Sequence, residues 1–434
     1  MRRRCLLALI VTVAACSGEP GGGGVNIVAS TATSTSAPTT STSTTTTLPT
    51  TTTTLPTHQV IGRVVDEGGR PVARAFVTLG ELRAVSGPDG WFSLETTAPG
   101  PMVVSKPGWT STELAWDETA VSYQATISPL TIRGLRVAGE AAASDTHFDQ
   151  LLTLADTTAV NTLVFDTKRE SGEVLYQTGV QTAIDTGAVN PMYDPVARIA
   201  QAHEHDLYTV TRIAAFEDDI RSGAIAEEKL AGSWLDPESP TARSYVLELA
   251  AEACEMGFDE IQFDYVRYPS GRTADVSGQR DLTQEHRIGV VAGFLAEARS
   301  LLHPMGCAVS AAVFGIVVSA PDDQGLGQRP EEVSAQVDTL SPMVYPSHYS
   351  PGWLGFEDPN DYPYEVTADA IADSLPRLRD GSRLRPYLQA FWWTNAEIRQ
   401  SIQAAEDAQV GWMLWNILSN YDVSAIPTDA ELGG

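Results

Sequence analysis

The feature of this sequence that most constrains its fold is a repeated alternation of apolar strands and amphipathic stretches after Ile132. The strand-like segments are residues 132–139, 161–168, 207–216, 260–268, 307–315, 339–345, 383–391 and 410–416. Helical patterns lie between them, for example at residues 194–206, 241–257, 285–303 and 395–409. Eight such units in about 300 residues favour a closed (β/α)8 barrel over an open doubly wound sheet, which usually has fewer strands and a glycine-rich first turn.

A different texture precedes this region. Residues 58–130 alternate short strands with turn residues, which predicts a small all-β sandwich. Segments 62–77, 89–92 and 106–109 of this region resemble the carboxypeptidase regulatory-like domain of transthyretin-type topology. That resemblance implies a spacer or adhesive module without chemistry of its own. We therefore predict a multi-domain chain, with the β-sandwich followed by an α/β TIM barrel over residues 131–434.

The first residues have the pattern of an export signal. Residues 1–16 combine a basic start, a short apolar run and a small-residue stop. The end of this run resembles the lipobox of bacterial lipoproteins, which implies lipidation of Cys16; ordinary signal-peptidase cleavage nearby is the alternative. Residues 17–57 are glycine-rich and then rich in Ser, Thr and Pro, which predicts a disordered tether. We expect an exported protein on the outer face of the cell membrane, anchored by lipid, or else secreted.

Charge and cysteine content narrow the function classes further. Acids outnumber bases by 55 to 28, and a formal charge of −27 argues against nucleic acid as a partner. The two cysteines outside the leader, Cys254 and Cys307, are predicted to be free thiols rather than a disulfide. Neither a metal-type cysteine pair nor a nucleotide-binding glycine loop occurs, and His203 and His205 lie two apart on a helix, so we expect no metal or cofactor.

Barrel enzymes carry their active sites at the carboxyl ends of the strands, so the residues found there are candidates for chemistry. Asp264 is the candidate nucleophile or general acid/base, and Asp166 is its tentative partner, with an ion pair to Lys168 or Arg212 as the alternative role. Other candidates for this second carboxyl group are Glu217, Asp218, Asp236, and Asp322 or Asp323. The candidates for substrate binding are Arg212, Arg267, Tyr345, His348, Gln389, Trp392 and Asn416. Aromatic rings, amides and carboxylates on one rim are typical of a carbohydrate site.

Glu260 and Gln262 lie deeper on the strand that carries Asp264, and they are expected to form hydrogen bonds inside the barrel.

The same strands carry a second resemblance. Segments 258–269, 341–349, 385–389 and 411–416 resemble a bacterial family of glycosyl-hydrolase-like (β/α)8 barrels, over about residues 132–421. The resemblance implies a glycan as substrate and an activity class without a named sugar. One departure concerns the fifth strand, where Ala312 stands in place of the family's aspartate.

Two function classes follow. The first is a glycoside hydrolase acting on a cell-envelope or extracellular polysaccharide. The second, favoured by Ala312, is a catalytically inactive protein that binds glycan or scaffolds the envelope. A purely structural surface protein is a third, weaker hypothesis.

Overall fold

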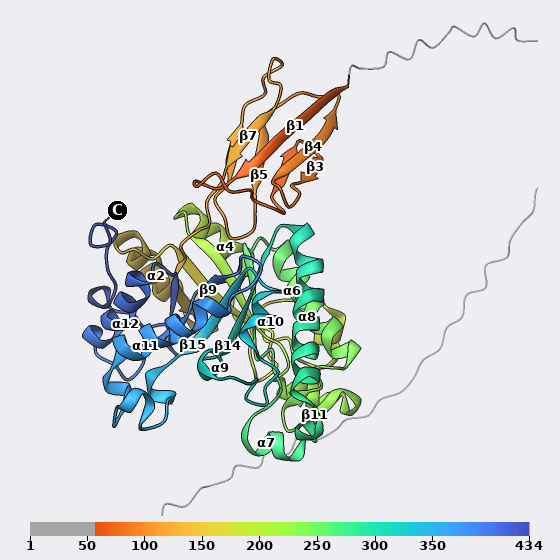
Figure 1. Ribbon diagram of the computed structural model, residues 1–434. Coiled ribbons are helices and arrows are strands. Elements are labelled where there is room, and N and C mark those ends of the chain that lie inside the picture. Colours follow the sequence, from red (N-terminus) through yellow and green to blue (C-terminus); the bar gives the residue numbers. More distant parts are fainter. Residues whose placement is uncertain (1–56, 434) are drawn as a thin grey trace, which may run out of the picture. The chain divides into compact units, whose positions relative to one another are not determined.

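The structure is a computed structural model that describes residues 57–433 (Figure 1). The predicted signal, the lipidation of Cys16 and nearly all of the predicted tether fall outside the described residues and stay predictions. Among the residues described, none of the helices has the length and apolar character needed to cross a membrane.

The region that follows the tether forms two small sheets. One sheet has the order β4-β1-β7, and the other has the order β3-β2-β5-β6. Their bounds are β1 His58–Val65, β2 Phe76–Leu79, β3 Leu82–Val85, β4 Trp91–Thr96, β5 Met102–Ser105, β6 Thr112–Leu114 and β7 Tyr123–Thr126. Every second residue of β4 is buried, as expected when one face of a strand packs on a core. Val64, Val77, Phe92 and Met102 bring both sheets into one apolar core.

The rest of the chain is built on a closed ring of eight parallel strands, as predicted. In ring order these are β8 Arg133–Val137, β9 Thr162–Lys168, β10 Tyr208–Ala214, β13 Glu260–Asp264, β14 Ala308–Phe314, β15 Thr339–Val344, β17 Tyr387–Gln389 and β18 Trp412–Trp415. The pairing of β18 with β8 and that of β14 with β15 complete the ring. Every segment predicted as a barrel strand contains one of these strands.

Helices surround the ring (Figure 1). The longer ones are α2 Asp145–Thr157, α4 Pro195–Glu204, α6 Pro240–Glu255, α8 Gln284–Met305, α11 Pro363–Ser374 and α12 Asn395–Asp407. Shorter ones are α1 Gly139–Ala143, α3 Gln181–Asp185, α5 Asp219–Ala224, α7 Gly271–Val276, α9 Ile316–Ser319 and α10 Pro330–Ser334, and the short strands are β11 Lys229–Ala231, β12 Trp234–Leu235 and β16 Arg383–Leu384. Local sequence sets their starts: Thr394 and Glu397 form a capping box on α12, and Asp194 caps α4 ahead of a proline in its first turn.

The main core lies between the strands and the helices. All seven residues of β9 are buried, because helices cover the outside of a parallel barrel and side chains fill its inside. Phe294 of α8 shows the packing, since its ring lies 5.0 Å from that of Phe216 and 5.2 Å from that of Phe263.

The inside of the barrel holds a buried polar network near the amino-terminal ends of the strands. Glu260 binds the guanidinium of Arg385, whose Nη1 donates to Glu260 Oε2 at 3.1 Å, and it also accepts from Ser310. Gln262 accepts from the Tyr387 hydroxyl and donates to Ser310 at 3.2 Å. Glu260 and Gln262 therefore have the internal hydrogen-bonding role expected from the sequence.

The prediction of free thiols at Cys254 and Cys307 is wrong. The two residues form a disulfide, with their Cα atoms 6.0 Å apart. Cys254 lies near the end of α6, and Cys307 immediately precedes β14. A helix of a (β/α)8 barrel runs antiparallel to the strands, so its end returns to the edge where the next strands begin. This return brings together two cysteines that are 53 residues apart in the sequence.

Candidate functional site

A cavity of about 730 Å³ lies at the carboxyl ends of the barrel strands. Its lining residues lie on or shortly after five strands: Arg212 on β10, Asp264 and Arg267 from β13, Phe314 from β14, Tyr345 and His348 after β15, and Trp415 from β18. Tyr349 and Trp353, in the segment between β15 and α11, complete one wall. The cavity is thus at the end of the barrel where such folds bind ligands.

Asp264 is held in one orientation at this cavity. It is the last residue of β13 and is 5% exposed. Its Oδ2 accepts a hydrogen bond from Arg212 Nε at 2.8 Å, and Arg212 Nη2 lies 2.8 Å from the same oxygen. Its Oδ1 accepts from the backbone N–H of Tyr265 at 2.7 Å. Tyr265 has φ 50°, a left-handed conformation that non-glycine residues rarely adopt and that is enriched at functional sites.

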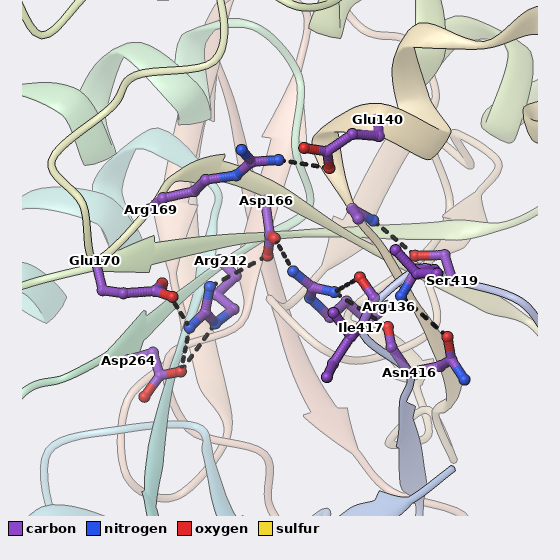
Figure 2. A network of polar contacts seen from close by, with 12 residues as sticks. Arg136, Glu140, Asp166, Arg169, Glu170, Arg212, Asp264, Asn416, Ile417 and Ser419 are labelled. Carbon is purple, nitrogen blue, oxygen red and sulfur yellow. Dashed lines mark hydrogen bonds and ion pairs between the residues drawn. The ribbon is translucent and has the colours of Figure 1, made fainter. Parts of the chain in front are cut away.

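Asp166 lies between Arg136 and Arg212 (Figure 2). It is not one of the residues that line the cavity. It has no exposed surface, it binds Arg136, and its Oδ1 is 3.3 Å from Arg212 Nη1. Burial on its own would raise the pKa of Asp166, but the charges of Arg136 and Arg212 outweigh it, so the pKa is below its ordinary value. Of the roles considered from the sequence, the ion pair with Arg212 is present, whereas Lys168 pairs with Asp218 at 2.9 Å.

Arg212 is the centre of this network (Figure 2). Besides Asp264 and Asp166, it has Glu170 at 3.7 Å from its Nη2. Arg136 extends the network by donating to the backbone oxygens of Asn416 and Ile417. Both guanidiniums also lie over the ring of Trp415, at 4.2 Å for Arg136 and 4.8 Å for Arg212. Arg212 therefore orients Asp264, and Asp166 and Glu170 in turn hold Arg212 in place.

Aromatic side chains form the opposite wall. The Tyr345 ring packs edge-to-face on His348 at 5.3 Å and on Phe391 at 5.4 Å. Burial lowers the pKa of His348, so its imidazole is neutral at neutral pH. The Oη atoms of Tyr345 and Tyr349 and Trp353 Nε1 have no hydrogen-bond partner within residues 57–433. Buried polar atoms of this kind normally find partners, and a ligand rich in hydroxyls offers them.

A close backbone approach shapes this wall. A Cβ on Gly315, which follows β14, would lie 2.4 Å from the Met343 carbonyl oxygen and 2.8 Å from the Tyr349 hydroxyl. Glycine is therefore required for β15 and the Tyr349 ring to come this near.

Three of the predicted substrate-binding residues lie outside the cavity. Gln389 accepts from Ser347 and donates to Asn360, so it holds the loop that carries His348. Asn416 donates to the Ala390 carbonyl and accepts from the backbone of its own loop. Trp392 is 79% exposed and lines a second hollow of about 390 Å³ together with Trp393, His147 and Asn416.

The other candidates for the second carboxyl group make different contacts. Asp218 is buried with Lys168, Asp323 binds Arg287 at 2.8 Å, and Asp236 and Asp322 accept from the backbone two residues ahead in turns. Glu217 is the fifth of these candidates. Burial raises the pKa of Glu217, and the negative charges of Glu170 and Asp264 raise it further. The Ser233 hydroxyl donates a hydrogen bond to the Glu217 carboxyl group at 3.2 Å.

Ala312 faces the inside of the barrel. It is fully buried in an apolar cluster with Val164, Val210, Tyr345 and Met413. The fifth strand therefore supplies a methyl group where the family resemblance implied a carboxylate. Within residues 57–433, no group of three or more His, Cys, Asp or Glu side chains is arranged to hold a metal ion.

Sequence reasoning assigned no role to two cavity residues. Tyr349 and Trp353 lie in the segment between β15 and α11, where no periodic pattern marks them. The signal that could have identified Tyr349 is its position next to His348, within a segment already quoted for the family resemblance.

An eight-stranded parallel barrel with a ligand-sized cavity at its carboxyl end defines the class of this protein as a (β/α)8 barrel. Residues 134–421 match the family described as "Putative glycosyl hydrolase domain", and the chain belongs to this family. No curated protein matches the sequence.

Solved structures are similar to this chain as well. The glycoside hydrolase domain of PgaB (BpsB) from Bordetella bronchiseptica superposes with a TM-score of 0.50 at 13% identity, covering 67% of this chain and 95% of that one. At this identity the similarity supports the fold alone. A hypothetical protein from Ruminiclostridium thermocellum is 30% identical over 41% of this chain and 96% of its own, with a TM-score of 0.35.

Proposed function

We propose that the barrel is a glycoside hydrolase that acts on a cell-envelope or extracellular polysaccharide. The observation that carries this proposal is the 730 Å³ cavity in which Asp264 is the one acidic residue among the lining residues, facing rings and unpartnered hydroxyls. Aromatic faces stack on sugar rings, and a fixed carboxylate can act at the anomeric carbon. Membership of the glycosyl hydrolase family supports the same activity class.

Glycoside hydrolysis normally uses two carboxyl groups with different tasks. We assign Asp264, which Arg212 holds in one orientation by direct contact, as the nucleophile or base. We assign Glu217 as the proton donor, because it lies just beyond the cavity lining within the electrostatic reach of Arg267 and Asp264, and because a raised pKa keeps a carboxyl group protonated closer to neutral pH. Asp166 then becomes a positioning residue, which holds Arg212 from behind.

Export is part of this proposal. The disulfide between Cys254 and Cys307 supports it, because such bonds persist in oxidising compartments and are rare in reducing ones. The leader and Cys16 would deliver the barrel to the outer face of the membrane, or release it, and residues 58–130 would serve as a spacer or adhesive module.

A panel of polysaccharides, with reducing-sugar release as the readout, tests the proposal. Replacing Asp264 with Asn should lower the rate by about 10²- to 10⁴-fold, the usual range for a positioned acid or base. Asp166→Asn is a useful second variant, because it disturbs Arg212 without removing a group from the cavity. Equal release by wild type and Asp264→Asn would remove Asp264 from the mechanism.

The second candidate is a barrel that binds glycan without cleaving it. The observations that favour it are Ala312 on the fifth strand and the two contacts that Arg212 makes with one oxygen of Asp264. Saturable glycan binding without any sugar release, in wild type and variants alike, would support this candidate.

A further inference from the structure

Arg267 differs from every other buried arginine in the described part of the chain. Seven arginines are buried there: Arg136, Arg198, Arg212, Arg221, Arg267, Arg287 and Arg385. Six of them form ion pairs with carboxylates, for example Arg221 with Glu228 at 2.6 Å and Arg287 with Asp323 at 2.8 Å. Arg267 alone forms none within residues 57–433, although it is only 6% exposed. A buried charge without a partner is costly, so its retention calls for an explanation.

The surroundings of Arg267 fix its position and leave its edge available. Its guanidinium lies 4.4 Å from the centre of the Trp234 ring and 4.3 Å from that of Phe314. The hydrogen bond that it makes inside the described protein runs from Nη1 to the backbone oxygen of Tyr268, at 3.0 Å. A guanidinium has five N–H donors in one plane, so most of its donors remain for a ligand that approaches in that plane.

The open side of Arg267 belongs to the cavity that also contains Asp264. Burial lowers the pKa of Arg267, and the charges of Asp264 and Glu217 oppose this from beyond ion-pair distance. Arginine stays protonated at neutral pH even so. The neighbouring Arg212 is different, because Asp264, Asp166 and Glu170 already surround it. The cavity therefore offers one cation with free donors beside the proposed catalytic carboxylate.

We propose that the glycan bound in this cavity is acidic, and that Arg267 binds the carboxylate of a uronic-acid-type sugar next to the bond that is cleaved. This inference rests on the proposed function and adds the chemical class of the substrate. A carboxylate is planar and accepts two parallel N–H bonds from a guanidinium edge, which matches an arginine whose faces are covered by rings. A sulfate or phosphate ester presents related oxygens, so the test includes it as a separate arm.

The net charge of −27 does not oppose this assignment. Charges separated by more than about 8 Å are largely screened at physiological ionic strength, whereas a contact with a buried cation is screened much less. The general negative charge should slow the approach of an acidic polymer, and the contact with Arg267 should decide which sugar remains bound.

The test compares three matched sets of oligosaccharides on the full chain: uronic acid oligomers, the same oligomers after carboxyl reduction to neutral sugars, and sulfated neutral oligomers. Binding is followed by the tryptophan fluorescence of the cavity and by calorimetry. Wild type should bind the uronic acid form at least about tenfold more tightly than its reduced form. Arg267→Gln should bring this ratio close to one, and Arg267→Lys should leave it in between, because an ammonium keeps the charge and loses the planar pair of donors.

Arg272→Gln is the matched control, since it removes the same charge from an exposed position five residues further along the chain. It should leave the ratio unchanged. A thermal melt of each variant shows whether it is folded. A sulfated oligomer that binds more tightly than the uronic acid form would overturn the carboxylate assignment, as would a wild-type ratio of one or a ratio that Arg267→Gln does not change. Neutral glycans cleaved with dependence on Asp264, but without preference for acidic ones, would overturn this inference and leave the proposed function intact. If no glycan binds, both are overturned.

Discussion

Two acid–arginine pairs on the same strand invite comparison. Glu260 begins β13 and binds Arg385, and Asp264 ends the strand and binds Arg212. All four side chains are almost completely buried. At the lower end, Ser310 donates to Glu260 and accepts from Gln262, and neither Glu260 nor Arg385 lines the cavity described above. At the upper end the pair borders a cavity of about 730 Å³ and the unpaired Arg267.

Burial and charge pairing therefore do not identify a functional site on their own. Both pairs combine a carboxylate with an arginine, and these residue types are common in catalytic sites. Only the upper one adjoins the cavity and the strained backbone at Tyr265. The lower pair is expected to serve stability, and the upper pair is expected to serve chemistry.

The largest expected effect on stability is in the lower pair. Glu260→Gln would leave Arg385 charged and buried without a counter-ion, and should reduce the free energy of unfolding by about 3–5 kcal/mol. Asp264→Asn should cost less, about 0.5–1.5 kcal/mol, because Arg212 keeps Asp166 as a partner and the amide can still accept a hydrogen bond. Denaturant unfolding followed by tryptophan fluorescence measures both. Equal losses in the two variants would remove the distinction drawn between the two ends.

The disulfide belongs to the lower end as well. Replacing Cys254 and Cys307 together with Ser should lower the free energy of unfolding by about 2–4 kcal/mol, because the bridge restricts the unfolded chain across a 53-residue separation. Glycan cleavage measured well below the melting temperature should be retained, because the bridge lies at the end of the barrel opposite the cavity. Loss of cleavage in a folded double variant would contradict this separation of roles.

The pH dependence of glycan cleavage tests the role proposed for Glu217 at the upper end of the barrel. A general acid works while it is protonated, so activity is present below its pKa and is lost as the pH rises through it. The pKa of Glu217 is raised, mainly by burial, which moves this loss toward neutral pH. Glu217→Gln should lower kcat/KM by about 10²-fold at acidic pH and remove the alkaline limb of the profile. A variant that keeps the wild-type limb would show that another group donates the proton.

The smallest effect is expected at the rim beyond the cavity. Trp392 is exposed, and its ring packs edge-to-face on Phe391, which in turn packs on Tyr345 and His348 of the cavity wall. Trp392→Ala should weaken binding by about 0.5–1.5 kcal/mol, and the loss should grow with oligosaccharide length. Trp91→Ala, at an exposed tryptophan of β4, is the matched control. A loss that is the same for all lengths would argue against an extended binding surface.

Much of the fold was predictable because it follows from local patterns. Apolar runs separated by amphipathic stretches occur eight times, and a closed barrel fits that many parallel units in about 300 residues better than an open sheet does. The location of the candidate site at the strand ends follows from the same topology, and Asp264, Arg212, Arg267, Tyr345 and His348, all named from the sequence, line one cavity there.

The roles of the other candidates could not be read in the same way. Asp166 lies near the end of β9, two residues before Lys168, yet its side chain is buried against Arg212. Gln389 and Asn416 also lie at strand ends, but their amides are used by neighbouring loops. A pattern along the chain gives the face of a strand to which a side chain belongs, and it does not give the partners that loops from elsewhere bring to that side chain.

The amino-acid sequence alone determined the order and number of barrel strands and the chemical types gathered at their ends, because periodicity and turn residues act over short distances. The tertiary structure decided which charges meet. It joined two cysteines 53 residues apart, surrounded Arg212 with acids and left Arg267 without one. Such pairings depend on distances of a few ångströms between segments far apart in the chain, and only the closure of the barrel fixes those distances.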